Sequence, residues 1–214
     1  MQMQDKGKFI TLEGGEGAGK STQIVMMADF LTAKGIDVVV TREPGGSPDA
    51  EEIRRLLISG GKDRWDAVTE LLLFSAARRN HLQKKILPAI NAGKWVISDR
   101  FADSTTAYQG CGYGENSVPK EMLEAVYKMV AGEFVPDVTF ILDIPVDEGM
   151  KRVIARGEDK ARFEQMDMAF HEKLRAAYAK IAADNPDRCV LVNALNTKEN
   201  IHKELVKIIE QRFF

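Results

Sequence analysis

The most informative residues of this sequence form a glycine-rich loop that ends in a lysine and a serine. The run is Gly14-Gly15-Glu16-Gly17-Ala18-Gly19-Lys20-Ser21, followed by Thr22, and it fits the pattern G-x-x-x-x-G-K-[ST]. In such a loop the glycines let consecutive backbone N–H groups converge on an anion, and the start of the next helix adds partial positive charge. Lys20 can reach the β- and γ-phosphates of a nucleotide, and the Ser21 hydroxyl can bind Mg²⁺. We therefore predict a nucleoside triphosphate site at this loop.

Charged residues follow two further apolar runs of the chain. The segment Thr41-Arg42-Glu43-Pro44-Gly45-Gly46 is typical of a sharp turn, and it places Arg42 where an anion could bind. Asp99 stands where a carboxylate orders Mg²⁺ and its waters, and the planar guanidinium of Arg100 suits a bridge between two phosphates. The alternative interpretation is a surface ion pair at the first segment and a helix cap with a salt bridge at the second.

An aromatic residue and an arginine lie four residues apart on one predicted helix. Phe74 and Arg78 therefore share a helix face, where the ring could stack on a base and the guanidinium could donate to a base carbonyl. Taken alone, Phe74 is more typical of a core residue.

A charged, weakly apolar stretch lies between the fourth apolar run and a helix near Met166. It contains Arg152, Arg156, Lys160 and Arg162. An arginine supplied by a mobile segment can stabilise the charge on a phosphoryl group in transfer, and such a segment also excludes water. We predict a mobile lid at about residues 156–166; a solvated basic helix end is the alternative.

The elements that would position these residues alternate along the chain. Strands are predicted at residues 9–12, 37–41, 95–98, 138–142 and 189–192, and helices at residues 20–33, 50–58, 67–90 and 198–211. Apolar strands separated by helices indicate an α/β fold with a parallel sheet that is covered on both faces. Ligands bind beyond the carboxyl ends of such strands, which is where the clusters above occur.

The bulk composition is that of one soluble α/β domain covering residues 1–214. The chain has 44% hydrophobic and 29% charged residues, with a formal net charge of −2. This balance argues against a nucleic-acid partner, and no apolar stretch predicts a membrane span or a signal peptide. Cys111 and Cys189 have no metal-ligand spacing, so we interpret them as reduced thiols of a cytoplasmic protein.

Together these motifs resemble the thymidylate kinase family, in its bacterial type. The resemblance runs from Phe9 to the last helix and rests on the glycine-rich loop, the Thr41–Gly46 segment, Phe74 with Arg78, Asp99-Arg100 with the segment from Ser104 to Gly110, and the charged stretch. It implies a P-loop three-layer sandwich with a five-stranded parallel sheet and a small lid, usually a homodimer. It also implies the Mg²⁺-dependent reaction of ATP with dTMP to give ADP and dTDP.

The resemblance further implies a role for each matching residue. On the donor side these are the loop from Gly14 to Thr22 and, packed on adenine, Arg152. On the acceptor side Glu16 matches a carboxylate on the sugar 3′-OH, Phe74 a ring on thymine, and Tyr108 a ring that crowds a ribose 2′-OH. The other implied acceptor contacts are Arg42, Glu43, Pro44, Arg54, Arg78, Arg100, Ser104, Thr105 and Gln109. Magnesium is assigned to Ser21, Asp99 and Glu43, partly through water, and the catalytic residues are Lys20, Asp99, Arg100 and the lid arginine Arg162.

Two alternatives remain at this point. One is a P-loop ATPase or switch without a small acceptor; the chain lacks a guanine-reading N-K-x-D, and that alternative leaves Phe74, Arg78, Thr105 and Tyr108 unexplained. The other is a kinase of a different pyrimidine monophosphate, such as dUMP, because a methyl group in an apolar pocket discriminates by only about 1–3 kcal/mol.

Overall fold

Five parallel strands form the centre of the fold. The computed structural model describes residues 6–155, 157 and 162–214. The strands are β1 (Phe9–Gly14), β2 (Val38–Arg42), β3 (Trp95–Asp99), β4 (Val138–Asp143) and β5 (Cys189–Asn193), in the spatial order β2-β3-β1-β4-β5. The predicted α/β class and the parallel sheet are confirmed, and each strand ends one or two residues later than predicted.

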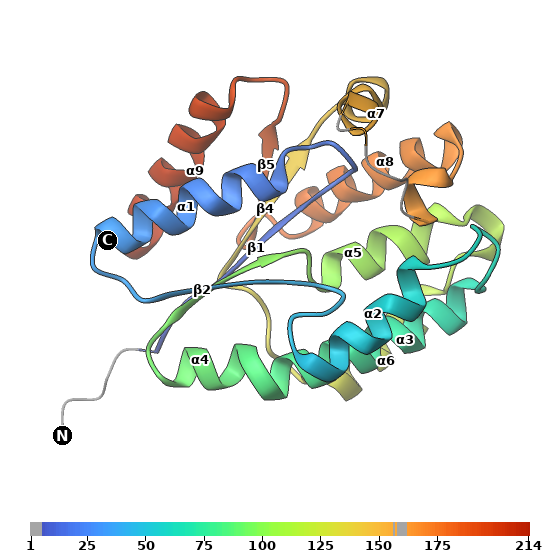
Figure 1. The fold of residues 1–214 in the computed structure, drawn as a ribbon, viewed down its shortest axis with the longest axis horizontal. Coiled ribbons are helices and arrows are strands. Elements are labelled where there is room, and N and C mark those ends of the chain that lie inside the picture. Colours follow the sequence, from blue (N-terminus) through green and yellow to red (C-terminus); the bar gives the residue numbers. More distant parts are fainter. Residues whose placement is uncertain (1–5, 156, 158–161) are drawn as a thin grey trace.

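Helices cover both faces of this sheet, as Figure 1 shows. Helices α1 (Lys20–Ala33) and α9 (Lys198–Phe213) pack on one face. The other face is covered by α4 (Leu87–Asn91), α5 (Ala102–Ala107), α6 (Lys120–Ala131) and α8 (Met168–Asp184). Because helices lie on both sides, β1 and β4 are buried along almost their whole length, which explains their continuous apolar sequence.

The remaining helices lie around the carboxyl edge of the sheet. Helices α2 (Pro48–Ile58) and α3 (Ala67–His81) pack on each other, and α7 (Val146–Ala155) directly follows β4. Short turns complete the described chain: η3 (Gly114–Asn116) and η4 (Arg162–Gln165) are 3₁₀ turns. In the part of the chain that the structure describes, no helix is long and apolar enough to cross a membrane.

Two π-helical turns interrupt the helical segments. The predicted helix at residues 67–90 is divided into α3 and α4 by η1 (Leu82–Ile86), and α5 continues into η2 (Tyr108–Gly112). A π turn holds an extra residue, so it changes the direction of the side chains that follow, and it is frequent at functional sites. The η2 turn carries Tyr108 and Gln109, two of the predicted acceptor contacts.

Candidate active site

The glycine-rich loop connects β1 to α1 at the carboxyl edge of the sheet. Gly19 stands directly before α1 with φ 91°, and Gly17 has φ 70°. A Cβ on Gly17 would lie 2.1 Å from the carbonyl oxygen of Gly149 on α7. The loop therefore needs glycine at both positions for its backbone conformation, and at Gly17 also for its close approach to α7.

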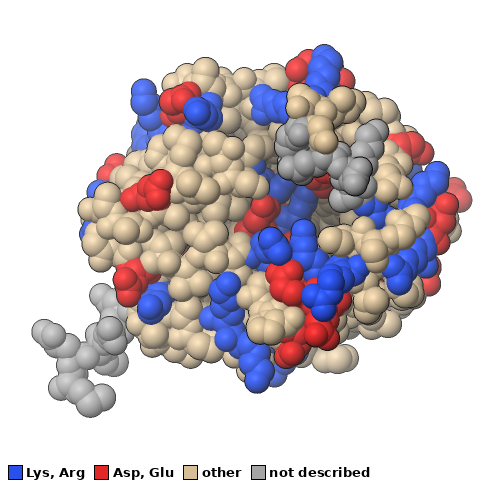
Figure 2. All heavy atoms as spheres, in the orientation of Figure 1, with Lys and Arg blue, Asp and Glu red and all other residues tan. Residues whose placement is uncertain are grey.

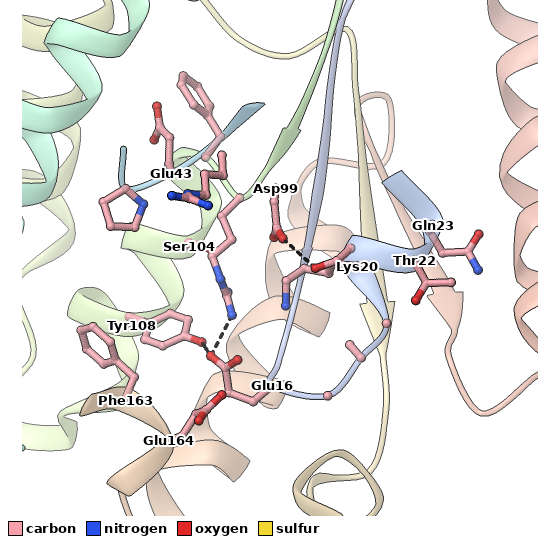
Figure 3. Close-up of a pocket in the computed structure, with 18 of the residues that line it drawn as sticks. Glu16, Lys20, Thr22, Gln23, Glu43, Asp99, Ser104, Tyr108, Phe163 and Glu164 are labelled. Carbon is pink, nitrogen blue, oxygen red and sulfur yellow. Dashed lines mark hydrogen bonds and ion pairs between the residues drawn. The ribbon is translucent and has the colours of Figure 1, made fainter. Parts of the chain in front are cut away.

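Lys20 lies inside the curve of the loop. Its side chain is almost buried, and Nζ donates to the carbonyl oxygens of Gly14 at 3.1 Å and Gly15 at 3.0 Å. Burial and the nearby Arg100 lower the pKa of Lys20, while Glu16 acts in the opposite direction. The Lys20 side chain thus lies within the loop and lines the cavity that Figure 3 shows.

Ser21 and Asp99 meet at the start of α1. Ser21 Oγ donates to Asp99 Oδ2 at 3.4 Å, and the pairing of β1 with β3 sets Asp99 opposite Leu12, next to the loop. Asp99 Oδ1 is buried and has no hydrogen-bond partner among the described residues. A hydroxyl and a carboxylate with a free oxygen are hard ligands that fit Mg²⁺, which commonly keeps waters and nucleotide phosphates as its other ligands.

Both carboxylate oxygens of Glu43, the third predicted magnesium ligand, have protein partners. Its Oε2 accepts from Arg78 Nε at 2.8 Å and its Oε1 contacts His81 Nδ1 at 3.1 Å, and the side chain is 4% exposed. Glu43 thus does not join Ser21 and Asp99 in one ligand set; within the described ranges no cluster of three or more histidine, cysteine or acidic residues could hold a metal. In this arrangement Glu43 holds Arg78.

Arg100 lies where the loop meets the rest of the cavity. Its backbone has φ 68°, an uncommon value for a residue other than glycine. Nη2 donates to Glu16 Oε1 at 2.9 Å, and Nη1 reaches the carbonyl oxygen of Gly14, Ser104 Oγ and Tyr178 Oη. Burial alone would raise the pKa of Glu16, but Arg100 and Lys20 outweigh burial and lower it to about 2. Tyr108 Oη also donates to Glu16, at 2.8 Å.

A buried carboxyl group shares the Ser104 hydroxyl with Arg100. Glu13, near the end of β1, is fully buried and accepts from the backbone N–H of Phe101 at 2.7 Å and from Ser104 Oγ at 2.5 Å. Burial, together with the nearby Asp103, raises the pKa of Glu13 to about 7. No role is predicted for Glu13 from the sequence, although a charged residue within an apolar strand indicates that the residue has one.

A cavity of about 870 Å³ extends from the loop to the predicted acceptor residues. Figure 2 shows a hollow on this face with both basic and acidic side chains around it. The predicted residues that line the cavity include Glu16 to Thr22, Arg42, Glu43, Pro44, Arg54, Phe74, Arg78, Asp99, Arg100, Ser104, Thr105, Tyr108, Gln109 and Arg152. The structure thus brings both halves of the predicted site to one space.

The end of the cavity that contains the predicted acceptor contacts has a basic part and an aromatic part. Arg54 donates to the carbonyl oxygen of Pro44 at 2.8 Å; burial and the neighbouring Arg42 lower its pKa. Arg78 is 4% exposed and Nη2 donates to Thr105 Oγ1 at 3.0 Å. Phe74 contributes its ring to the cavity wall beside them.

The donor end is formed by α7 and the segment after β5. Arg152, the first arginine of the charged stretch, lies on α7, and its guanidinium donates to the carbonyl oxygens of Gly17 and Ala194. Residues after β5 also line this end, namely Asn196, Thr197, Lys198 and Ile201.

The chain is similar to known proteins over almost its whole length. The family described as thymidylate kinase matches residues 12–205. The chain belongs to the thymidylate kinase family. A thymidylate kinase from Caulobacter vibrioides is 51% identical over 97% of this chain and 98% of its own length, and one from Bradyrhizobium sp. (strain ORS 278) is 48% identical over 98% and 92%. The crystal structure of thymidylate kinase from Ehrlichia chaffeensis has 35% identity and a TM-score of 0.78, and the match covers 96% of this chain and 99% of that chain.

Arg162, the lid arginine assigned by the thymidylate kinase resemblance, does not line the cavity. Arg162 is 1% exposed; Nε donates to the carbonyl oxygen of Leu57 at 3.1 Å, Nη1 donates to that of Lys62 at 3.2 Å, and Nη2 forms an ion pair with Glu70. The structure does not bring Arg162 to the phosphate loop, because a buried carboxylate and two carbonyl groups hold its guanidinium. Arg156 and Lys160, which belong to the predicted lid, lie outside the described residues.

Several residues of this site were not singled out from the sequence. Phe163 and Glu164 line the cavity from η4, and Figure 3 shows Phe163 beside Tyr108. Tyr178 on α8 bonds to Arg100 and Ser104. These residues are more than 50 positions from the residues that they meet, so no local spacing could have indicated them.

Proposed function

We propose that this chain transfers the γ-phosphoryl group of ATP to dTMP, which gives ADP and dTDP. The observation that supports this most directly is the continuous cavity, which contains the phosphate loop, Arg100 and the pocket of Phe74, Arg78 and Tyr108. An ATPase or switch without a small acceptor would need only the first of these three parts.

The donor is held by its phosphates and its base. The backbone N–H groups of the loop and the Lys20 ammonium bind the triphosphate, and the start of α1 adds its dipole. Lys20 exchanges the carbonyl groups of Gly14 and Gly15 for phosphate oxygens. Arg152, which already spans the loop and the segment after β5, packs on adenine.

The acceptor is bound at both of its ends. Its phosphate lies among the guanidinium groups of Arg42, Arg54 and Arg100, so negative charge is matched and the attacking oxygen is oriented toward the loop. Phe74 stacks on the base, while Arg78 and Thr105, which are bonded to each other, read its edge. Pro44, Ser104 and Gln109 complete the walls of this pocket.

The sugar lies next to Glu16 and Tyr108. The low pKa of Glu16 keeps a carboxylate that can accept from a 3′-OH. The Tyr108 hydroxyl is bonded to that carboxylate and its ring occupies space near the sugar, which disfavours a ribose 2′-OH.

Magnesium belongs to this proposal because the Ser21 hydroxyl and the Asp99 carboxylate fit it. When bound, the ion neutralises charge on the phosphates during transfer. Lys20 and Arg100 are the protein cations that stabilise the transferring group, and Arg100 is the one placed between donor and acceptor. Arg162 is not included among them in this arrangement, since it would first have to leave Glu70.

A homodimer and a cytoplasmic location are further parts of the proposal. Helices α3 and α6 are in contact with each other and expose large apolar side chains, among them Leu72 at 57% and Met129 at 80%. Such a face suits burial against a second copy of the chain. Both cysteines are free thiols, as expected in a reducing compartment. Sedimentation of the wild type and of a Leu72→Glu variant tests the dimer; equal masses for the two would oppose this face as the interface.

The activity is tested by measuring ADP release from Mg·ATP with no acceptor and with each of dTMP, dUMP, dCMP and ribothymidylate. The proposal expects strong stimulation by dTMP and a smaller effect of dUMP. ADP release that no monophosphate changes would favour the ATPase or switch, and a higher kcat/KM for dUMP would favour the other acceptor. Lys20→Ala controls for a contaminating kinase, because it removes the donor contact.

A further inference from the structure

Glu70 is a buried carboxylate that connects three separate parts of the chain beside the cavity. It lies in the first turn of α3 and is fully buried. It accepts from Gln109 Nε2 at 2.7 Å and from Tyr113 Oη at 2.8 Å, and it forms the ion pair with Arg162 of η4. We call these four residues the Glu70 cluster. Glu70 itself is not among the residues that line the cavity.

The partners of Glu70 satisfy its charge. A buried carboxylate is costly unless it is paired and hydrogen-bonded, and here one cation and two neutral donors surround it. Arg162 in turn donates to the carbonyl oxygens of Leu57, at the end of α2, and Lys62, in the α2–α3 connection. The ion pair therefore joins η4 to the α2–α3 pair.

The Glu70 cluster holds two groups that do line the cavity. Gln109 is one, and its amide is bonded to Glu70. Phe163, the residue after Arg162, is the other; the Arg162 guanidinium lies 4.6 Å from the centre of its ring. The ring centre of Phe163 is 5.4 Å from that of Tyr108 and 6.1 Å from that of Phe74. Both groups thus form the wall around the aromatic end of the pocket.

We propose that Glu70 is a positioning residue that sets the shape of the base end of the acceptor pocket through Gln109 and Phe163. The inference rests on the proposed function, because it assigns that end of the cavity to the acceptor base. It concerns acceptor binding and selection. It does not concern ATP binding, since the donor end lies on α7 and the segment after β5, away from the Glu70 cluster.

The test is the kinetics of Glu70→Gln, which keeps the size of the side chain and removes its charge. We expect the KM for dTMP to rise about tenfold, because small misplacements of positioning groups are costly, while the KM for ATP stays within about twofold. The ratio of kcat/KM for dTMP to that for dUMP should also fall, a change that a loss of stability alone would not produce. Glu52→Gln, an exposed residue on α2, is the matched control.

Other variants keep the proposal testable if Glu70→Gln does not fold. Tyr113→Phe removes one contact to Glu70 without removing charge, and it should shift the same two quantities in the same direction by a smaller factor. Where Glu70→Gln does fold, a double-mutant cycle with Arg162→Gln should show effects on the KM for dTMP that are not additive, since both substitutions break the same ion pair. Additive effects would contradict the proposal that Glu70 positions Phe163 through its ion pair with Arg162.

The outcomes separate this inference from the function on which it rests. If the wild type phosphorylates dTMP and a folded Glu70→Gln protein keeps its KM for dTMP and its dTMP to dUMP ratio within about twofold, the Glu70 inference is wrong. If the wild type does not phosphorylate dTMP, the proposed function is wrong. Calorimetric binding of dTMP to both proteins then decides the Glu70 inference without turnover: equal dissociation constants, or no binding to either protein, would overturn it.

Discussion

Arg100 and Glu16 form an ion pair of 2.9 Å that connects the phosphate loop with the acceptor side of the cavity. Both side chains are mostly buried, at 15% and 18% exposed, so neither is strongly screened by solvent. Arg100 also reaches the Gly14 carbonyl group with the same guanidinium. One side chain therefore contacts the donor loop and the group proposed to bind the acceptor sugar.

Arg100→Ala should lower kcat by about 10²–10³, the usual loss when one preorganised donor to developing charge is removed. Arg100→Lys should recover little of this, because an ammonium group cannot form the forked contacts of a guanidinium. Steady-state kinetics with ATP and dTMP measure both variants. Arg55→Ala on the exposed side of α2 is the control, and a kcat near that of the control in Arg100→Ala would refute the role.

Glu13 should make the stability of the fold fall as the pH rises. Its pKa is about 7 in the folded protein against 4.5 as the reference, so between these values the folded state holds a proton that the unfolded state has lost. This proton's contribution to the free energy of unfolding is fully present below pH 4.5 and is lost by about pH 7. The loss amounts to a difference on the order of 3 kcal/mol.

Glu13→Gln removes this titration while it keeps an acceptor for the Phe101 N–H. The free energy of unfolding of the variant, relative to that of the wild type, should therefore be larger at pH 8 than at pH 5, so that the variant is relatively more stable at the higher pH. Urea unfolding at both pH values measures the difference. The same difference at pH 5 and pH 8 would mean that Glu13 does not carry this proton.

Arg162→Ala distinguishes the two roles considered for this arginine. If Arg162 acts on the phosphates, kcat should fall by about 10³ or more, as for an arginine finger. The contacts with Glu70, Leu57 and Lys62 predict a different result: a lower melting temperature and a higher KM for dTMP, with kcat reduced less than about tenfold. Melting curves and saturation kinetics, recorded with dTMP and with ATP as the varied substrate, separate these results.

Tyr108→Ala should weaken the preference for a deoxyribose acceptor. Loss of the ring opens space beside the sugar, and steric discrimination of this size is worth about 10–200-fold. The ratio of kcat/KM for dTMP to that for ribothymidylate is the measurement. Tyr108→Phe is the matched control, since it keeps the ring and removes only the hydroxyl bonded to Glu16; an unchanged ratio in Tyr108→Ala would leave the preference to other groups.

Local sequence was enough to predict the sheet, the phosphate loop and most of the residues that line the two ends of the cavity. Local signals are enough for these features: an apolar strand needs only its own residues, and the loop from Gly14 to Ser21 is contiguous. The Phe74 and Arg78 pair could be placed on one face because helical spacing is a local property.

The tertiary structure decided which charges are paired and which face the cavity. Glu43 bonds to Arg78 and His81, and Arg162 bonds to Glu70, and in both cases the partners are between 35 and 92 positions apart. Such pairs form only when helices and loops pack, because burial makes an unpaired charge costly and so selects a partner. Sequence motifs predicted which residues could do the chemistry, and packing determined which of them are free to do it.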